Sequence, residues 1–296
     1  IPLISNIKNN IFALKDIDFM FEIPGCSRFR VNYNRRLGNS ALVIRNIPYQ
    51  IPTLEDLSLP DTIKKIARQT QGLILVTGPT GSGKSTTLAA IIDRIAKSSA
   101  KHIITIEDPV EYVFTSDKGI VSQRQVGIDT SSFPDGIKYS LRQDPDVILI
   151  GEIRDKETMD AALKASETGH LVLSTLHTND AVQTINRIIN LFDESTRDLA
   201  RKQLAETLKA TIAQKLIYSE ANKKRYPACE ILITTPAVRD YILKDNLDEI
   251  YNLIKENNID EAIKNYEKFI ELTTEAAYKD SVLTKINLLK LKTKKN

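Results

Sequence analysis

Short apolar stretches recur along the first two thirds of the chain. Three β-rich stretches come first and predict a meander at residues 17–23, 28–34 and 41–47. Four further apolar stretches, each predicting a strand, lie at 72–78, 102–108, 146–152 and 171–176. Segments with helical spacing separate these four, starting at Lys84, near 135–143 and at 156–169. Because such alternation is typical of a mostly parallel sheet covered by helices on both faces, the pattern predicts an α/β fold.

The organisation of the chain follows from the same pattern. Four parts are predicted: a partial N-terminal α/β domain at 1–47, a proline-containing linker at 48–60, an α/β core at 61–244 and a helical region at 245–296. Most of the last third of the chain has helical spacing, and there only residues 228–234 predict a strand. The chain begins at Ile1 without a methionine, so we expect it to be a segment of a longer protein.

Charge and composition change this picture little. The net charge of +3 depends on a C-terminal tail, whose lysines are Lys285, Lys290, Lys292, Lys294 and Lys295. No basic stripe interleaved with aromatic residues is present in the body of the chain, so no nucleic-acid partner is expected. Two lone cysteines give neither a disulfide framework nor a paired zinc motif, which suits a reducing compartment. No apolar run approaches the roughly 18 residues of a membrane span.

A glycine-rich turn after the strand at 72–78 carries the most specific motif. It matches G-x-x-x-x-G-K-[ST], which predicts a phosphate-binding loop formed by Gly78, Pro79, Thr80, Gly81, Ser82, Gly83, Lys84, Ser85 and Thr86. Backbone N–H groups and the helix N-terminus would hold nucleotide phosphates. Lys84 would reach the β- and γ-phosphates, and Ser85 would bind magnesium. An ordinary glycine-rich turn is the alternative.

Two acidic groups follow apolar strands. Glu152 ends the stretch at 146–152, on the side where ligands of parallel sheets bind, whereas Asp146 begins it. Glu107 and Glu111 follow another strand. One carboxylate can hold magnesium or its waters while another orients or deprotonates the attacking water. Solvated loop charges are the alternative for each acid taken alone.

Two histidines flank the apolar stretch at 171–176. As the ends of a strand, His170 and His177 would lie about 20 Å apart, too far to share a metal ion. His177 leaves the strand at its carboxyl end, beside Glu152 and the phosphate loop, where an imidazole can donate to a γ-phosphate. His170 lies at the other end, with a structural role or contacts elsewhere.

Four motifs in order resemble the secretion ATPase superfamily, and within it the type IV pilus retraction ATPases. They are "GPTGSGKST", "TIEDPVE", "SLRQDPDVILIGEIRD" and "TGHLVLSTLHTN", and the similarity runs from about Asp18 to about Lys244. The resemblance implies a hexamer whose protomers pair a PAS-like N-terminal domain with a RecA-like P-loop domain, with ATP and Mg²⁺ between them.

The resemblance also assigns residues. Lys84 and Ser85 match the phosphate and magnesium residues, Glu111 the catalytic glutamate, and Glu152 the Walker B glutamate near magnesium. Glu107, His177 and His170 are expected at the nucleotide, the last on the resemblance alone. Arg28 and Arg30 resemble arginines that the family directs toward nucleotide, and they share one strand face. A solvated strand face is the alternative.

The far C-terminal part bears on the direction of filament movement. Residues 235–245 partly match a helix of the retraction ATPases, keeping Ala237, Arg239 and Ile242 but departing at Asp240 and Tyr241. The four-cysteine module usual in assembly and type II secretion ATPases is absent from the sequence. The sequence therefore favours a cytoplasmic retraction motor that works on an inner-membrane platform protein. An assembly or secretion ATPase, a nucleic-acid translocase and a nucleotide-gated scaffold remain as alternatives.

Overall fold

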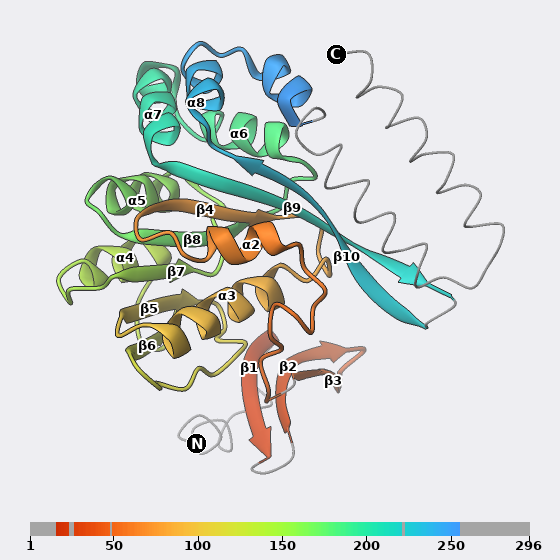
Figure 1. Ribbon diagram of the computed structural model, residues 1–296. Coiled ribbons are helices and arrows are strands. Elements are labelled where there is room, and N and C mark those ends of the chain that lie inside the picture. The colour runs from red at the N-terminus through yellow and green to blue at the C-terminus, as the bar shows by residue number, and fades with distance from the viewer. Residues whose placement is uncertain (1–15, 24–26, 48, 221–222, 255–296) are drawn as a thin grey trace.

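A computed structural model describes residues 16–23, 27–47, 49–220 and 223–254, which form a sheet of three strands and a sheet of seven with helices around it (Figure 1). The strands are β1 (Asp16–Ile23), β2 (Ser27–Arg36), β3 (Asn39–Ile47), β4 (Gly72–Thr77), β5 (His102–Glu107), β6 (Ile120–Gln125), β7 (Val147–Ile150), β8 (Leu171–Leu176), β9 (Leu208–Ser219) and β10 (Lys224–Ile233). The helices are α2 (Asp61–Ile66), α3 (Lys84–Ser98), α4 (Phe133–Ser140), α5 (Lys156–Glu167), α6 (Ala181–Ile189), α7 (Glu194–Thr207) and α8 (Pro236–Leu243).

The N-terminal sheet is the meander that the sequence predicts. β1, β2 and β3 pair in that order, and both pairings are antiparallel. Ile47, at the end of β3, is buried in the same core as residues of α2 and α3, so this sheet packs against the larger unit. Residues 1–15 of the predicted partial domain lie outside the described ranges.

The large sheet has the order β10-β9-β4-β8-β7-β5-β6. Every pairing from β9 to β6 is parallel, and β10 runs antiparallel to β9 at the edge. The carboxyl ends of β4, β5, β7 and β8 therefore meet at one edge of the sheet. The prediction of a mostly parallel α/β sheet is confirmed.

Two hydrophobic cores explain why these strands are mostly apolar. On β4, Leu73 and Leu75 face the core shared with α4 to α8, whereas Ile74 and Val76 face the core shared with α2 and α3. Successive side chains of a strand point to opposite faces, so a strand covered on both sides has apolar residues at most positions and not only at alternate ones.

The prediction that most of the last third of the chain is helical is wrong for residues 208–219 and 224–227. The first range forms β9, and the second is the start of β10, whose remainder coincides with the predicted strand at 228–234. Lys, Gln, Ala and Leu favour a helix in isolation, and the first half of β9 is buried on both faces, which removes the alternation typical of strands. Pairing with the open side of β4 decides the structure instead. Strand β6, which has no marked apolar pattern, is a further strand that the sequence analysis did not predict.

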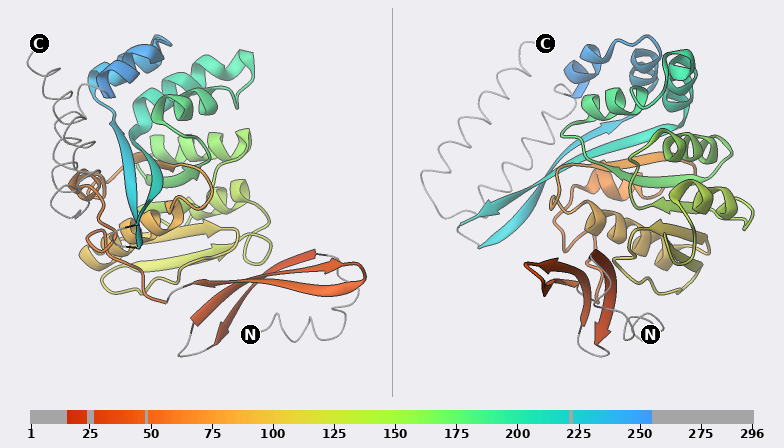
Figure 2. Two further views of the ribbon diagram at one scale, coloured as in Figure 1. Left: turned by 90° about the vertical axis from the view of Figure 1, so that its right-hand side faces the viewer. Right: turned by 180° about the vertical axis from the view of Figure 1, so that it is seen from behind.

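Strands β9 and β10 are longer than β4, the strand through which their hairpin joins the sheet. β4 pairs with β9 only as far as Ala213, whereas the pairing of β9 with β10 continues to Ser219 and Lys224. The two strands therefore extend past their neighbours as a ribbon (Figure 2).

The structure describes almost all of the predicted linker but only the first part of the predicted C-terminal region. Leu54 and Leu59, within the predicted linker, are buried against the core of α2 and α3, so this segment is packed rather than loose. Residues 247–254 are helical, and the rest of the predicted C-terminal helical region, residues 255–296, lies outside the described ranges. Among the helices of the described ranges, none has the length and apolar character needed to cross a bilayer.

The central position of β7 gives a prediction for stability. Ile148 is fully buried on β7, whereas Ile120 on the edge strand β6 is 63% exposed. Ile148→Ala is expected to lower the free energy of unfolding by about 2–5 kcal/mol, because it removes buried methyl groups and leaves a cavity. Ile120→Ala is the matched control and should change it by less than about 0.5 kcal/mol. Urea unfolding of the two variants measures the difference, and equal losses would contradict the burial of β7.

Candidate functional site

The predicted phosphate-binding residues form one continuous loop between β4 and α3. Gly78, Gly81 and Gly83 all have positive φ angles, of 143°, 79° and 87°. Residues with a Cβ atom rarely adopt such angles, whereas glycine does so readily. A Cβ atom at Gly78 would also collide with the carbonyl oxygen of Gln214 on β9. The loop thus needs glycine at 78 both for its backbone conformation and for its close approach to β9.

Lys84 opens α3 and is buried. Its Nζ atom donates to the carbonyl oxygens of Gly78 and Pro79, at 2.8 and 3.1 Å, so it lies across the mouth of the loop. Burial lowers the pKa of Lys84, and the negative charge of Glu152 opposes that shift. Glu152 is therefore close enough to act on the lysine electrostatically, as their predicted placement at one sheet edge requires.

Gln214 is a residue of this site that the sequence analysis missed. Its side chain is buried, its Nε2 atom donates to the Ser82 carbonyl oxygen at 2.8 Å, and its Oε1 atom accepts from the Thr87 hydroxyl at 2.8 Å. No motif marks it, because it stands far from the loop in sequence, on a strand that was predicted to be helical.

Glu152 and His177 meet at the carboxyl ends of two neighbouring strands. β7 and β8 are paired in parallel, and the His177 Nε2 atom lies 3.5 Å from Glu152 Oε2. The guanidinium of Arg154, a second residue that the sequence analysis missed, lies 2.5 Å from Glu152 Oε1. One carboxylate thus contacts two cationic or ionisable groups beside the phosphate loop.

The acidic segment at the end of β5 contains Glu107, Asp108 and Glu111, and of these only the Glu107 side chain is buried. Glu107 is buried, and its Oε1 atom accepts from the hydroxyl of Thr105 at 2.7 Å and from Gln123 at 3.3 Å. Its Oε2 atom lies 3.4 Å from the Glu111 amide nitrogen. Burial raises the pKa of Glu107. These contacts favour a positioning role for Glu107, and the nucleotide-binding role expected from the sequence stays a prediction.

Two contacts attach this acidic loop to other parts of the site. The Tyr112 hydroxyl lies 3.1 Å from the Thr86 hydroxyl in the first turn of α3. From the N-terminal sheet, Arg28 donates through Nη1 to the Glu111 carbonyl oxygen at 3.1 Å. Glu111 is therefore tied to the N-terminal sheet directly and, through its neighbour Tyr112, to the phosphate loop.

The two N-terminal arginines differ in their contacts. Arg28 reaches Glu111 and also lies 3.9 Å from Glu22 on β1. The side chain of Arg30, two positions further along β2, makes no hydrogen bond or ion pair with another residue in the described ranges. Its contact with nucleotide stays a prediction.

The two histidines lie at opposite ends of β8, as the sequence predicts. His170 Nδ1 lies 3.0 Å from the Ala165 carbonyl oxygen and 3.1 Å from the Thr168 hydroxyl, at the C-terminal end of α5. Its backbone carbonyl accepts from the Gly72 amide at the start of β4. The structure therefore does not bring His170 to the phosphate loop of its own chain, and the nucleotide role implied for it stays a prediction.

Asp146 occupies the opposite edge of the sheet. Its carboxylate accepts from the His102 amide at 2.9 Å and from Lys101 at 2.9 Å. It joins the starts of β5 and β7, as expected for the acid placed away from the phosphate side.

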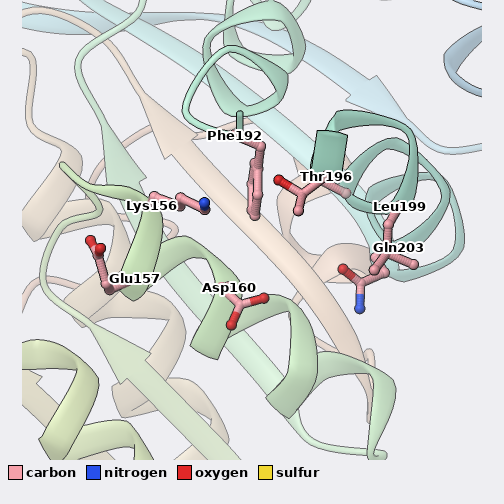
Figure 3. A pocket seen from close by; sticks show the side chains of 8 residues that line it. Lys156, Glu157, Asp160, Phe192, Thr196, Leu199 and Gln203 are labelled. Atoms are coloured by element: carbon pink, nitrogen blue, oxygen red, sulfur yellow. The ribbon is translucent and has the colours of Figure 1, made fainter. Parts of the chain in front are cut away.

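A hollow between α5 and α7 is separate from this site. It is lined by Lys156, Glu157, Asp160, Phe192, Thr196, Leu199, Ala200 and Gln203 (Figure 3). None of the predicted site residues lines it, so the candidate site is the convergence of loops at the sheet edge.

Comparisons with known proteins agree with this geometry. The family model "Type II/IV secretion system protein" matches residues 16–291. A Pseudomonas aeruginosa protein named Type IV pilus retractation ATPase PilT is 46% identical over 241 residues, which make up 81% of this chain and 70% of the relative. A Neisseria gonorrhoeae protein named Twitching motility protein is 45% identical over 81% of this chain and 64% of the relative.

Solved structures show the same likeness. The crystal structure of the pilus retraction motor PilT with bound ADP has a TM-score of 0.79 and 45% identity, and the match covers 85% of this chain and 72% of that one. The ATPase DotB of Legionella pneumophila has a TM-score of 0.75 at 34% identity, over 85% of this chain and 71% of that one. The expected RecA-like α/β fold and the resemblance read from the four motifs are confirmed.

The buried carboxyl of Glu107 gives a prediction that depends on pH. Because its pKa is raised above the ordinary 4.5, ionisation stabilises the unfolded chain more than the folded one. Glu107→Gln should therefore raise the free energy of unfolding at about pH 7.5, and this gain should vanish as the pH falls below the ordinary carboxyl pKa. Denaturant unfolding at both pH values measures it. The exposed Glu206 provides the control, and a Glu107→Gln gain no larger than that of Glu206→Gln would contradict the inferred burial cost.

Proposed function

Because the chain belongs to the Type II/IV secretion system protein family, we propose that it is an ATP-hydrolysing motor that retracts type IV pili. One observation carries the enzymatic part of this proposal. The phosphate loop, Glu152, His177 and the loop of Glu111 meet at one sheet edge, where substrates of parallel α/β sheets bind. The named relatives support the retraction role.

The loop has the properties needed to hold nucleotide phosphates. Its glycines allow the positive φ angles with which a backbone can curve around an anion, and α3 adds its positive N-terminal dipole. The Ser82 hydroxyl is buried without a partner among the described residues, so a polar group is available inside the loop. Lys84, held across the loop by two carbonyl oxygens, supplies the positive charge for β- and γ-phosphates.

Oxygen donors suited to magnesium lie beside this loop. The Ser85 hydroxyl is exposed at the start of α3, and the Glu152 carboxylate interacts electrostatically with the neighbouring Lys84. Mg²⁺ prefers oxygen ligands and keeps several waters, so these two residues could hold it directly or through water. When bound, the ion neutralises charge that develops on the phosphate oxygens.

In the proposed reaction, Glu111 accepts a proton from the attacking water while the water oxygen bonds to the γ-phosphorus. The bond to the bridging oxygen breaks, and ADP and phosphate leave. Glu107 and Arg28 hold the backbone of Glu111 from two sides, which keeps its carboxylate oriented. His177, oriented by Glu152, donates to the γ-phosphate and so distinguishes ATP from ADP.

Arginines from the N-terminal sheet complete the proposed site. Arg28 already reaches the acidic loop, and Arg30 follows on the same strand face. Their guanidinium groups would neutralise charge in the transition state, either within one chain or across an interface. We propose a homo-hexamer at the cytoplasmic face of the membrane that acts on an inner-membrane platform protein and has no nucleic-acid substrate.

The carboxylate roles are tested by paired substitutions. Glu111→Gln is expected to bind ATP and to hydrolyse it at least about 10²-fold more slowly, because the amide cannot accept the proton. Single-turnover hydrolysis and nucleotide affinity measure the two effects separately. Near-normal turnover in Glu111→Gln together with an inactive Glu152→Gln would transfer the base role to Glu152. Lys84→Ala should be inactive in either case.

The cellular role is tested by deleting the gene and counting surface pili. Retained, excessive pili are expected, because filaments would still assemble but could not be withdrawn. Complementation with the wild-type gene should restore normal numbers, and the Lys84→Ala gene should not. Bald cells would indicate an assembly or secretion ATPase instead, and DNA-stimulated hydrolysis with steep salt dependence would indicate a translocase.

A further inference from the structure

The β9–β10 hairpin contacts two of the loops that face the proposed nucleotide. Gln214 on β9 pairs with Cys229, and the next pair is Ala213 with Glu230. Side chains of successive pairs point to opposite faces of the ribbon. Gln214 and Glu230 therefore lie close together along the hairpin but on different faces.

On one face, Gln214 shapes the phosphate loop. The Ser82 carbonyl needs a donor and the Thr87 hydroxyl an acceptor, and the amide of Gln214 supplies one of each. The backbone carbonyl oxygen of Gln214 also lies against Gly78. The side-chain Nε2 atom of Gln214 would be 2.9 Å from a Cβ atom built at Gly83. Both ends of the loop are thus in close contact with one residue of β9.

On the other face, Glu230 holds the loop that carries His177. This loop runs from the end of β8 to Asp180, the N-cap of α6. Glu230 Oε1 accepts from the Ala181 amide at 2.9 Å, while Asp180 accepts from the Gln183 amide. The start of α6 is therefore fixed to β10, and His177 is only four residues from this attachment.

We propose that Gln214 and Glu230 are positioning residues, which hold the phosphate loop and the His177 loop at a fixed separation on the two faces of one hairpin. The inference rests on the proposed ATPase function. Gln214 acts on the loop that binds the phosphates of ATP and ADP alike. Glu230 acts through His177, which faces the γ-phosphate alone.

The two residues should therefore have different kinetic signatures. Gln214→Met keeps the side-chain volume but loses both hydrogen bonds, and should raise the Kd for ADP and the KM for ATP about tenfold, with a smaller change in kcat. Glu230→Ala should lower kcat about tenfold through a misplaced His177, with the Kd for ADP within about twofold of wild type. ADP titration and steady-state ATPase assays on the full chain measure these quantities.

Thr211 on the same strand provides the matched control. It is fully buried, and its hydroxyl has no hydrogen-bond partner among the described residues, so Thr211→Val should leave ADP affinity, KM and kcat unchanged. Melting temperatures of all three variants detect general destabilisation. If Gln214→Met and Glu230→Ala lose ADP affinity and kcat in the same proportion, or lose neither, the inference is overturned. A wild-type protein that binds ADP but does not hydrolyse ATP would refute the proposed function, while the effect of Gln214→Met on ADP affinity would still test the Gln214 anchor.

Discussion

Parallel pairing of β5, β7, β8 and β4 is the interaction on which the candidate site depends. These strands are neighbours in that order, so the loops that follow them emerge side by side at one edge. Antiparallel neighbours would send alternate loops to opposite edges. The 3.5 Å approach of His177 to Glu152 and the effect of Glu152 on Lys84 both follow from this arrangement.

Burial of the sheet on both faces confines polar chemistry to the ends of the strands. The interiors of β4, β7 and β8 face two hydrophobic cores, and an ionised group there would have no compensation for lost hydration. Glu107, the last residue of β5, lies at the limit of this rule, with three polar neighbours around a buried carboxyl. Its hydrogen bonds hold the acidic loop in place. Burial disfavours the ionised carboxyl of Glu107, as its raised pKa reflects.

Much of this site could be predicted because its signals are local. The phosphate loop, Glu152 and His177 each follow a short apolar strand, and the parallel fold alone brings such ends together. Gln214, Glu230 and Tyr112 could not be found in this way, since each acts through a contact with a residue distant in sequence. β9 was missed for a related reason: its burial on two faces erases alternation, and its pairing with β4 overrides a helix-favouring composition.

The hydrogen bond from Arg28 to the Glu111 carbonyl joins the N-terminal sheet to the loop of the proposed catalytic base. Such a contact transmits in both directions, because coupling between two sites is thermodynamically reciprocal. In a motor of the kind proposed, a turnover step that shifts Glu111 would also pull on the sheet. Equally, a load on the sheet would act on the position of Glu111, so resistance from the filament and binding of nucleotide would influence each other through this contact.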